Sequence, residues 1–171
     1  LIGRVIGDMP AMRGQILGTE SDGEEALVIA EVPAKTSLGY PVELAAMSGG
    51  RAELCVRIVG LAESRRLDRV YRGKDRPTNV LSFPASPDER AVAGTLGDLV
   101  ICAPVVAAEA RAQGKAVAAH WAHMVVHGTL HLLGYDHGAP RQARVMERLE
   151  AGILAGLGHP DPYRTQDGSH A

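Results

Sequence analysis

The sequence predicts an α+β fold in which a small mixed sheet of about four strands packs against helices. Segments with the alternation or the short apolar runs of strands come mostly early in the chain, whereas the long helical patterns come mostly late. The length of 171 residues is that of one ordinary domain. We therefore expect one sheet, formed mainly by the earlier part of the chain and covered by the later helices.

The expected strands are short segments whose apolar residues alternate with polar ones or form continuous runs. They are residues 26–32, 51–59, 78–83 and 98–102. A helix over residues 35–47 would be interrupted by Gly39-Tyr40-Pro41, because proline lacks a backbone donor and clashes with the preceding turn. A second helix is expected over residues 61–72, and Gly73 ends it. Residues 84–97 are expected to form a loop, whose length favours a functional or mobile segment.

Three more helices are expected in the second half of the chain. The first begins at Pro104, since proline is favoured at the first helical position, and continues to Gly114. A longer helix is expected from about residue 116 to residue 133. The last helix, residues 140–157, ends at Gly158.

The chain is expected to form one domain with two short flanking segments. Residues 1–24 are rich in glycine and show no sustained period of either 2 or 3.6, which predicts an N-terminal extension that packs loosely or not at all. Residues 25–163 would form the domain, and residues 164–171 would form a C-terminal tail.

Charge and hydropathy exclude two classes of protein. With Lys+Arg 18 against Asp+Glu 20, the net charge of −2 disfavours a protein that coats nucleic acid by bulk positive charge, although a local basic patch is allowed. The longest uncharged apolar run, residues 99–108, is about half of the roughly twenty residues that a bilayer span needs. Cys55 and Cys102 lie in apolar, strand-like runs, where reduced buried thiols are expected. We therefore expect a cytoplasmic protein without a membrane partner.

Five of the seven histidines lie within eighteen consecutive positions: His120, His123, His127, His131 and His137. Helical spacing places the first four on one stripe that borders an apolar stripe. A single histidine on such a face is most often a packing or surface residue. The set is different, because His127, His131, Gly134 and His137 form the pattern H-x-x-x-H-x-x-G-x-x-H. One helical turn presents two nitrogens to one ion, and a glycine ends the helix so that the chain can deliver a third ligand.

Geometry favours His127, His131 and His137 as the metal ligands. His123 and His131 are roughly 12 Å apart along a helix axis, so both would reach one ion only with strain. Asp136 could instead serve as a ligand or as a hydrogen-bond acceptor for an imidazole. Three imidazoles and an open fourth position are typical of catalytic zinc, although nickel, copper and cobalt also suit imidazole. We predict one zinc ion per chain, with His120 and His123 as neighbours or packing residues.

The histidine spacing equals that of the metzincin peptidases, whose motif is H-E-x-x-H-x-x-G-x-x-H. Their general base is the glutamate after the first histidine, and this chain has Gly128 at that position. No carboxylate lies between His127 and His131. The scaffold therefore allows a zinc peptidase-like hydrolase, but the residues for amide hydrolysis are missing.

A second candidate feature is a run of basic residues within twelve positions, diluted by Asp68 and Asp75: Arg65, Arg66, Arg69, Arg72, Lys74 and Arg76. Such a run usually forms a solvated helix face. A local cationic surface beside a metal would also favour a substrate that carries phosphate, for which arginine supplies a rigid bidentate fork.

Three segments of the chain resemble the YbeY family of bacterial endoribonucleases: residues 71–84 (YRGKDRPTNVLSFP), residues 96–102 (LGDLVIC) and residues 120–137, which contain the histidine pattern. The resemblance extends from about residue 52 to the Asp161-Pro162-Tyr163 tail. It implies a metal-dependent endoribonuclease that cleaves single-stranded RNA. It also implies that His127, His131 and His137 hold zinc and that Arg72 is the functionally important, catalytic arginine.

The same resemblance implies a place in ribosomal RNA maturation, including the 3′ end of the small-subunit RNA, and in ribosome quality control. The implied partners are ribosomal RNA, the small ribosomal subunit and ribosome-associated proteins. Whether water or the substrate's own 2′-hydroxyl attacks the phosphate stays open. Two alternatives also stay open, a zinc peptidase-like hydrolase and a non-catalytic, ribosome-associated RNA-binding protein with a structural zinc.

Overall fold

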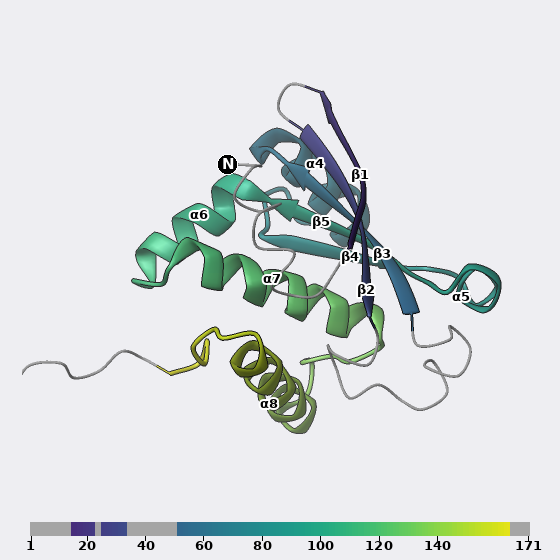
Figure 1. The fold of residues 1–171 in the computed structure, drawn as a ribbon. Helices are drawn as coiled ribbons and strands as arrows, with labels where there is room; N and C mark the ends of the chain where they lie inside the picture. The colour runs from purple at the N-terminus through teal and green to yellow at the C-terminus, as the bar shows by residue number, and fades with distance from the viewer. Residues whose placement is uncertain (1–14, 23–24, 34–50, 165–171) are drawn as a thin grey trace, which may run out of the picture.

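The computed structural model describes residues 15–22, 25–33 and 51–164 (Figure 1). The strands of this part are β1 (Gln15–Asp22), β2 (Glu25–Pro33), β3 (Arg51–Val59), β4 (Val80–Pro84) and β5 (Thr95–Cys102). The helices are α4 (Leu61–Arg72), α5 (Pro87–Ala93), α6 (Ala103–Ala112), α7 (Val117–Leu132) and α8 (Pro140–Gly156). The predicted α+β class is confirmed.

The strands form one mixed sheet in the order β1-β2-β3-β5-β4. The pairs β1–β2, β2–β3 and β4–β5 are antiparallel, and β3 and β5 are parallel. Strand β4 therefore lies at one edge of the sheet. The described part of the chain thus has five strands rather than about four.

The additional strand, β1, lies within residues 1–24, which the sequence assigned to an N-terminal extension. Its residues pair with β2 from Gln15↔Glu31 to Asp22↔Glu25, and the register shifts between Ile16 and Gly18. The segment QILGTESD shows no clean alternation of apolar and polar residues, so period alone does not reveal it. Backbone pairing with β2 forms the strand instead.

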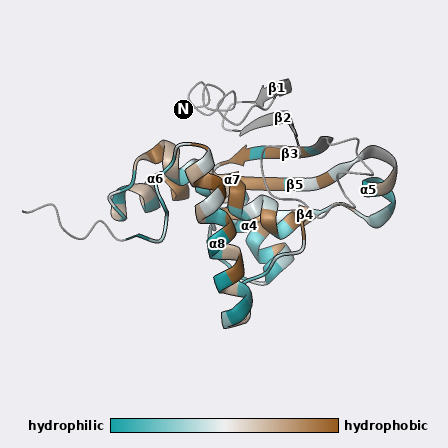
Figure 2. Cartoon of the chain, turned by 60° about the horizontal axis from the view of Figure 1, so that its bottom comes forward, coloured by the Kyte–Doolittle hydropathy of each residue, from teal (hydrophilic) through white to brown (hydrophobic). Residues whose placement is uncertain are grey.

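The two faces of the sheet are covered by different helices. On β5, Leu99 and Ile101 belong to the hydrophobic cluster that includes Trp121 and Met124 of α7. Their neighbours Val100 and Cys102 point the other way, into the cluster that includes Leu67 of α4. Helices α7 and α4 therefore lie on opposite faces, and β3 and β5 between them are mostly hydrophobic (Figure 2).

Helix α8 packs on the side of α7 that faces away from the sheet (Figure 1). Val126 and Leu130 of α7 form a buried cluster with Met146 and Leu154 of α8. Helix α7 is thus enclosed between the sheet and α8, which explains why it is the most apolar of the long helices. Among the described residues, no helix combines the length and the apolar character that a membrane crossing requires.

Residues 84–97 contain a short helix, α5, where the sequence predicted a loop. Ser86 caps its first turn: the hydroxyl accepts from the backbone N–H of Glu89, and the Glu89 side chain accepts from the backbone N–H of Ser86. Pro87 follows the cap, and Gly94 ends the helix with φ 66°. The capping pattern S-x-x-E was the available signal. The interrupted helix expected over residues 35–47 lies entirely within residues 34–50, outside the described residues.

Gly97 fixes how β4 and β5 approach each other. Its φ of +133° is one that side chains rarely adopt, and a Cβ atom there would overlap the backbone carbonyl oxygen of Phe83. Pro84 is the register partner of Gly97 at this point. The close approach brings the end of β4 against the start of β5, at the edge of the sheet.

Candidate metal centre

Helix α7 contacts the sheet closely at Gly128. A Cβ atom at this position would lie 2.8 Å from Leu99 Cδ2 and 3.2 Å from Val80 Cγ2. The Ser82 hydroxyl of β4 donates to the Gly128 carbonyl oxygen at 3.1 Å. A glutamate here would have to enter the hydrophobic layer between α7 and the sheet. The packing therefore gives a physical reason why the position of the metzincin general base holds glycine.

The C-terminus of α7 turns the chain back toward its own last turns. Gly134 has φ 90°, its N–H donates to the His131 carbonyl, and the Tyr135 N–H donates to the Leu130 carbonyl. This pair of hydrogen bonds is the Schellman arrangement that ends many helices. The predicted turn at Gly134 is thus present, and it carries His137 back beside α7.

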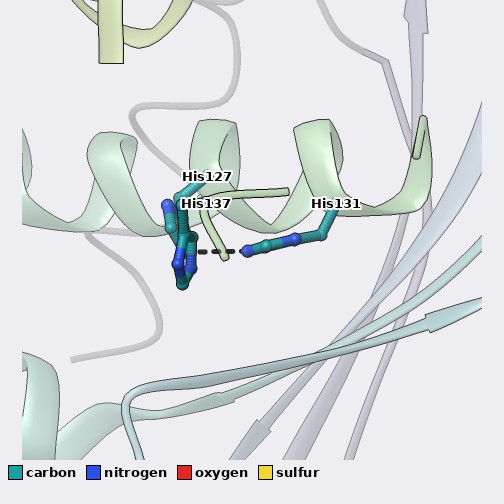
Figure 3. Close-up of side chains that lie close together, drawn as sticks. All are labelled: His127, His131 and His137. Atoms are coloured by element: carbon teal, nitrogen blue, oxygen red, sulfur yellow. Dashed lines mark hydrogen bonds between the residues drawn. The ribbon is translucent and has the colours of Figure 1, made fainter. Parts of the chain in front are cut away.

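The three predicted ligand residues converge at one point. Figure 3 shows the His127 and His131 side chains leaving α7 on the same side, with His137 lying against His127. His127 Nε2 and His131 Nε2 are 3.2 Å apart. The His137 ring stacks on the His127 ring at a centroid distance of 5.4 Å. One ring nitrogen from each residue lies within 4.8 Å of the other two.

This donor set fits a zinc ion. Zinc held tetrahedrally at about 2.0 Å from each nitrogen separates its ligand nitrogens by about 3.3 Å, close to the separation of His127 Nε2 and His131 Nε2. Imidazole nitrogens are ligands that zinc prefers, and His137 is exposed enough to leave a side open to solvent. Asp136 Oδ1 accepts from the His137 backbone N–H at 2.7 Å, so it orients the turn.

Glu150 of α8 is the partner of this centre that the sequence did not predict. Its carboxylate is fully buried, and Oε1 lies 2.6 Å from His127 Nδ1. His123 Nε2 lies 3.4 Å from Oε2, and the Tyr163 hydroxyl donates to the same oxygen. A signal existed: Glu150 falls midway between Met146 and Leu154, on the apolar stripe of its helix, where an unpaired charge is rare.

Burial raises the pKa of the Glu150 carboxyl, but hydrogen bonds from His123, His127 and Tyr163 outweigh burial and lower the pKa to about 2. Burial and the hydrogen bond to Glu150 raise the pKa of the Tyr163 hydroxyl, which keeps it protonated as a donor. The group at neutral pH is therefore an ionised carboxylate surrounded by donors.

His120 and His123 continue the histidine row along α7, away from the three predicted ligands. His120 is buried, and its Nε2 lies 2.8 Å from Glu109 Oε2 on α6. Asn79, which precedes β4, donates to the same carboxylate from Nδ2 at 3.2 Å. These contacts give His120 the packing role that the sequence suggested, because they join α6, α7 and the start of β4.

Arg72 lies apart from the histidines, at the end of α4 on the opposite face of the sheet. In the described part of the chain, no hydrogen bond, ion pair or ring contact joins Arg72 to His127, His131 or His137. Its Nη1 lies 3.9 Å from Oδ1 of the buried Asp68. The preceding Tyr71 packs edge-on against Phe83 of the edge strand β4. Arg72 therefore lies near the sheet edge formed by β4, where the face covered by α4 meets the face covered by α7.

The rest of the basic run behaves mostly as a solvated helix face. Arg65 makes two hydrogen bonds to Asp75, at 2.9 and 2.7 Å. Arg66 makes two to Glu63, at 2.8 and 2.6 Å. Within the ranges that the structure describes, Arg72 makes only the longer contact with Asp68, so its guanidinium is held less tightly by an acidic neighbour than the guanidinium of Arg65 or Arg66.

Comparison with known proteins identifies the family. The model of the family described as Endoribonuclease YbeY matches residues 34–158. The chain belongs to the YbeY family. A second model, that of the Elongation factor G C-terminus, matches residues 1–66 of this YbeY family member and overlaps the first match.

Curated relatives support the assignment to YbeY. The Endoribonuclease YbeY of Alkalilimnicola ehrlichii is 56% identical over 143 residues, which are 81% of this chain and 86% of the relative. That of Halorhodospira halophila is 62% identical over 121 residues, 68% of this chain and 77% of the relative. A Thermotoga maritima protein of known solution structure is 26% identical, with a TM-score of 0.48, and the match covers 71% of this chain and 85% of that one.

The metal-free protein is expected to lose stability as the pH falls below about 6.5. Burial lowers the pKa of His131, and electrostatic interaction with the neighbouring His127 and His137 lowers it further. Because its folded pKa lies below the unfolded value of 6.5, the contribution of His131 is complete above that pH and is lost as the pH falls through the folded pKa. Urea unfolding in a chelator between about pH 7.5 and about pH 5.5 measures this loss. The free energy of unfolding should change less with pH for His131→Gln than for the wild type. Equal pH dependence of the two proteins would show that His131 is not the group responsible.

Proposed function

We propose that this protein is a zinc-dependent endoribonuclease that cleaves single-stranded RNA. The observation that carries the proposal is the convergence of His127, His131 and His137 on one point with spacing suited to zinc. Membership of the YbeY family supports the reaction class. In this proposal the three histidines hold one zinc ion per chain.

Bound zinc would supply a Lewis acid for hydrolysis of a phosphodiester. The chain contributes the geometry around that position. Gly134 turns the backbone so that His137 joins the two histidines of α7, and Asp136 fixes the turn through the His137 N–H. The exposed side of the cluster, at His137, is where a flexible single strand has access.

We assign the catalytic arginine to Arg72, which would stabilise the negative charge that grows on the phosphate. Its side chain is 46% exposed, and its ion pair with Asp68 is long at 3.9 Å. It can therefore exchange that contact for a phosphate of an RNA strand that crosses the sheet edge at β4. Asp68 would hold the guanidinium near this edge between turnovers.

Replacement of Arg72 with alanine is expected to lower kcat/KM for a fluorescent single-stranded RNA by about 10²- to 10³-fold, the usual cost of removing one donor that stabilises growing charge. Arg72→Lys should recover part of the loss, since it keeps the charge but not the fork. Zinc content, measured by elemental analysis, should stay unchanged in both variants.

Arg65→Ala, purified in parallel, is the matched control because Arg65 belongs to the same basic run but is paired with Asp75. It also reports contamination by foreign ribonuclease, which would act equally in every preparation. If the Arg72 and Arg65 variants cleave at the same rate, Arg72 is not the catalytic arginine.

We place the reaction in the cytoplasm, in maturation of ribosomal RNA, including the 3′ end of the small-subunit RNA, and in ribosome quality control. The partners would be the small ribosomal subunit and ribosome-associated proteins. A precursor that carries the unprocessed 3′ end should be cut by the zinc-loaded protein, whereas a fully paired duplex of the same sequence should not. Equal cleavage of the two would contradict single-strand specificity.

The packing at Gly128 weakens the peptidase alternative, and cleavage of the precursor tests the RNA-binding alternative. A zinc peptidase needs a general base near the ion, and Gly128, at the metzincin base position, is packed against Leu99 and Val80. A non-catalytic RNA-binding protein with structural zinc would bind the precursor without cutting it.

A further inference from the structure

We propose that Glu150 is a positioning residue of the metal centre, which holds His127 through Nδ1 so that Nε2 stays available to the metal. We further propose that Tyr163, beyond the end of α8, holds Glu150 in that position. The inference rests on the proposed zinc site and deepens it. It assigns a function to the C-terminal segment that neither the histidine pattern nor the helix periods predict.

Glu150 is buried between α8 and α7. Its side chain is 0% exposed, and its helix packs on α7 through Met146 and Leu154. A buried carboxylate is costly unless donors satisfy it. The three described donors come from two parts of the chain, namely His123 and His127 of α7 and the Tyr163 hydroxyl after α8. This convergence indicates a built site rather than a chance surface contact.

The contact with Glu150 determines which nitrogen of His127 carries the proton. A carboxylate only accepts hydrogen bonds, so at 2.6 Å from Glu150 Oε1 the His127 Nδ1 carries the hydrogen. The neutral ring then has its lone pair on Nε2, the atom that faces His131 Nε2 at 3.2 Å. Carboxylates commonly orient metal-binding imidazoles in this way and raise their basicity. Glu150 therefore selects both the ring orientation and the tautomer that a metal requires.

The segment after α8 supports Glu150 through Tyr163. The Tyr163 ring packs edge-on against His123 at a centroid distance of 5.6 Å, and its hydroxyl donates to Glu150 Oε2. Lys115 anchors the segment, because its Nζ donates to the Pro162 carbonyl at 2.7 Å. Within the segment, the Tyr163 N–H donates to Asp161 Oδ1 at 3.0 Å and fixes the local turn. Tyr163 is thus held where it fixes the second carboxylate oxygen.

The test measures metal affinity rather than activity. Zinc Kd values are obtained by competition with a chromophoric chelator for the full-length wild type and for Glu150→Gln, which keeps the size of the side chain but removes its charge. Glu150→Gln is expected to bind zinc about 10- to 100-fold more weakly, the usual effect of removing a carboxylate that supports a ligand histidine. The visible spectrum of the cobalt-substituted protein should change too, because the ligand field from the His127 imidazole changes.

The matched control is Glu147→Gln, the same replacement on an exposed position of the same helix. It should retain the wild-type affinity and spectrum. Equal affinities for Glu147→Gln and Glu150→Gln would overturn the positioning role.

Tyr163→Phe removes only the hydroxyl. It tests the proposal independently, including the case in which Glu150→Gln does not fold. Weaker zinc binding by this variant supports the proposal, and unchanged binding overturns it. The failure of the proposed function gives a different result. In that case, the wild type would bind no zinc or cleave no RNA. If only the positioning role is wrong, the wild type binds zinc and cleaves RNA, and the Glu150 and Tyr163 variants bind zinc as tightly as the wild type.

Discussion

Replacement of His127 with alanine is expected to abolish stoichiometric zinc binding and to reduce RNA cleavage to the background level. The change removes the central residue of the three proposed ligands, whose ring contacts both His131 and His137. It also deprives the buried Glu150 of a donor at 2.6 Å, which should lower the free energy of unfolding by about 1–3 kcal/mol. Elemental analysis after gel filtration, single-turnover cleavage and urea unfolding measure the three effects.

His159→Ala is the control for this variant, because His159 follows α8 and is not among the three histidines that converge on one point. It should retain zinc and cleavage. A His127→Ala protein that keeps one equivalent of zinc and cuts RNA at the wild-type rate would refute the ligand assignment.

A second large loss of stability is expected from Gly128→Glu, which creates the motif of the metzincin peptidases in this chain. A Cβ atom at this position already lies 2.8 Å from Leu99 Cδ2, and Leu99 is fully buried. The rest of the side chain would overpack this layer and bury an unpaired charge, at a cost on the order of 3 kcal/mol or more. We therefore expect a protein that is largely unfolded, or that unfolds at much lower urea concentration, with no peptidase activity.

Gly152→Glu separates this packing effect from the general effect of a glutamate in a helix. Gly152 lies in α8, and a Cβ atom there meets no atom within 4 Å. Glutamate is a better helix former than glycine, so this variant should be at least as stable as the wild type. A stable Gly128→Glu protein that hydrolyses peptides would instead revive the peptidase alternative.

The histidine cluster could be predicted because its geometry is local. His127 and His131 are one helical turn apart, and Gly134 ends the helix at a place that returns His137 to them. Glu150 was not predicted, since its contact with His127 depends on how α8 crosses α7. Spacing along the chain contains no information on that crossing.

The same division between local and tertiary information applies to the fold. Strand β3 and helix α4 have the predicted bounds, because alternation in the one and helical spacing with a terminal Gly73 in the other are strong signals. Strand β1 has a weak pattern and is formed by pairing with β2. Arg72 lies on the far face of the sheet because α4 packs against the side of β5 that carries Val100 and Cys102, and this packing is tertiary too.

The metal ligands proposed on α7 and its turn all belong to one stretch of eleven residues, from His127 to His137. The unfolded chain therefore carries all three imidazoles close together and has its own affinity for zinc. By linkage, zinc stabilises the fold only by the difference between its affinities for the folded and the unfolded chain. That difference arises from residues distant in sequence, so the tertiary structure, rather than the histidines alone, determines how strongly zinc protects this protein against denaturation.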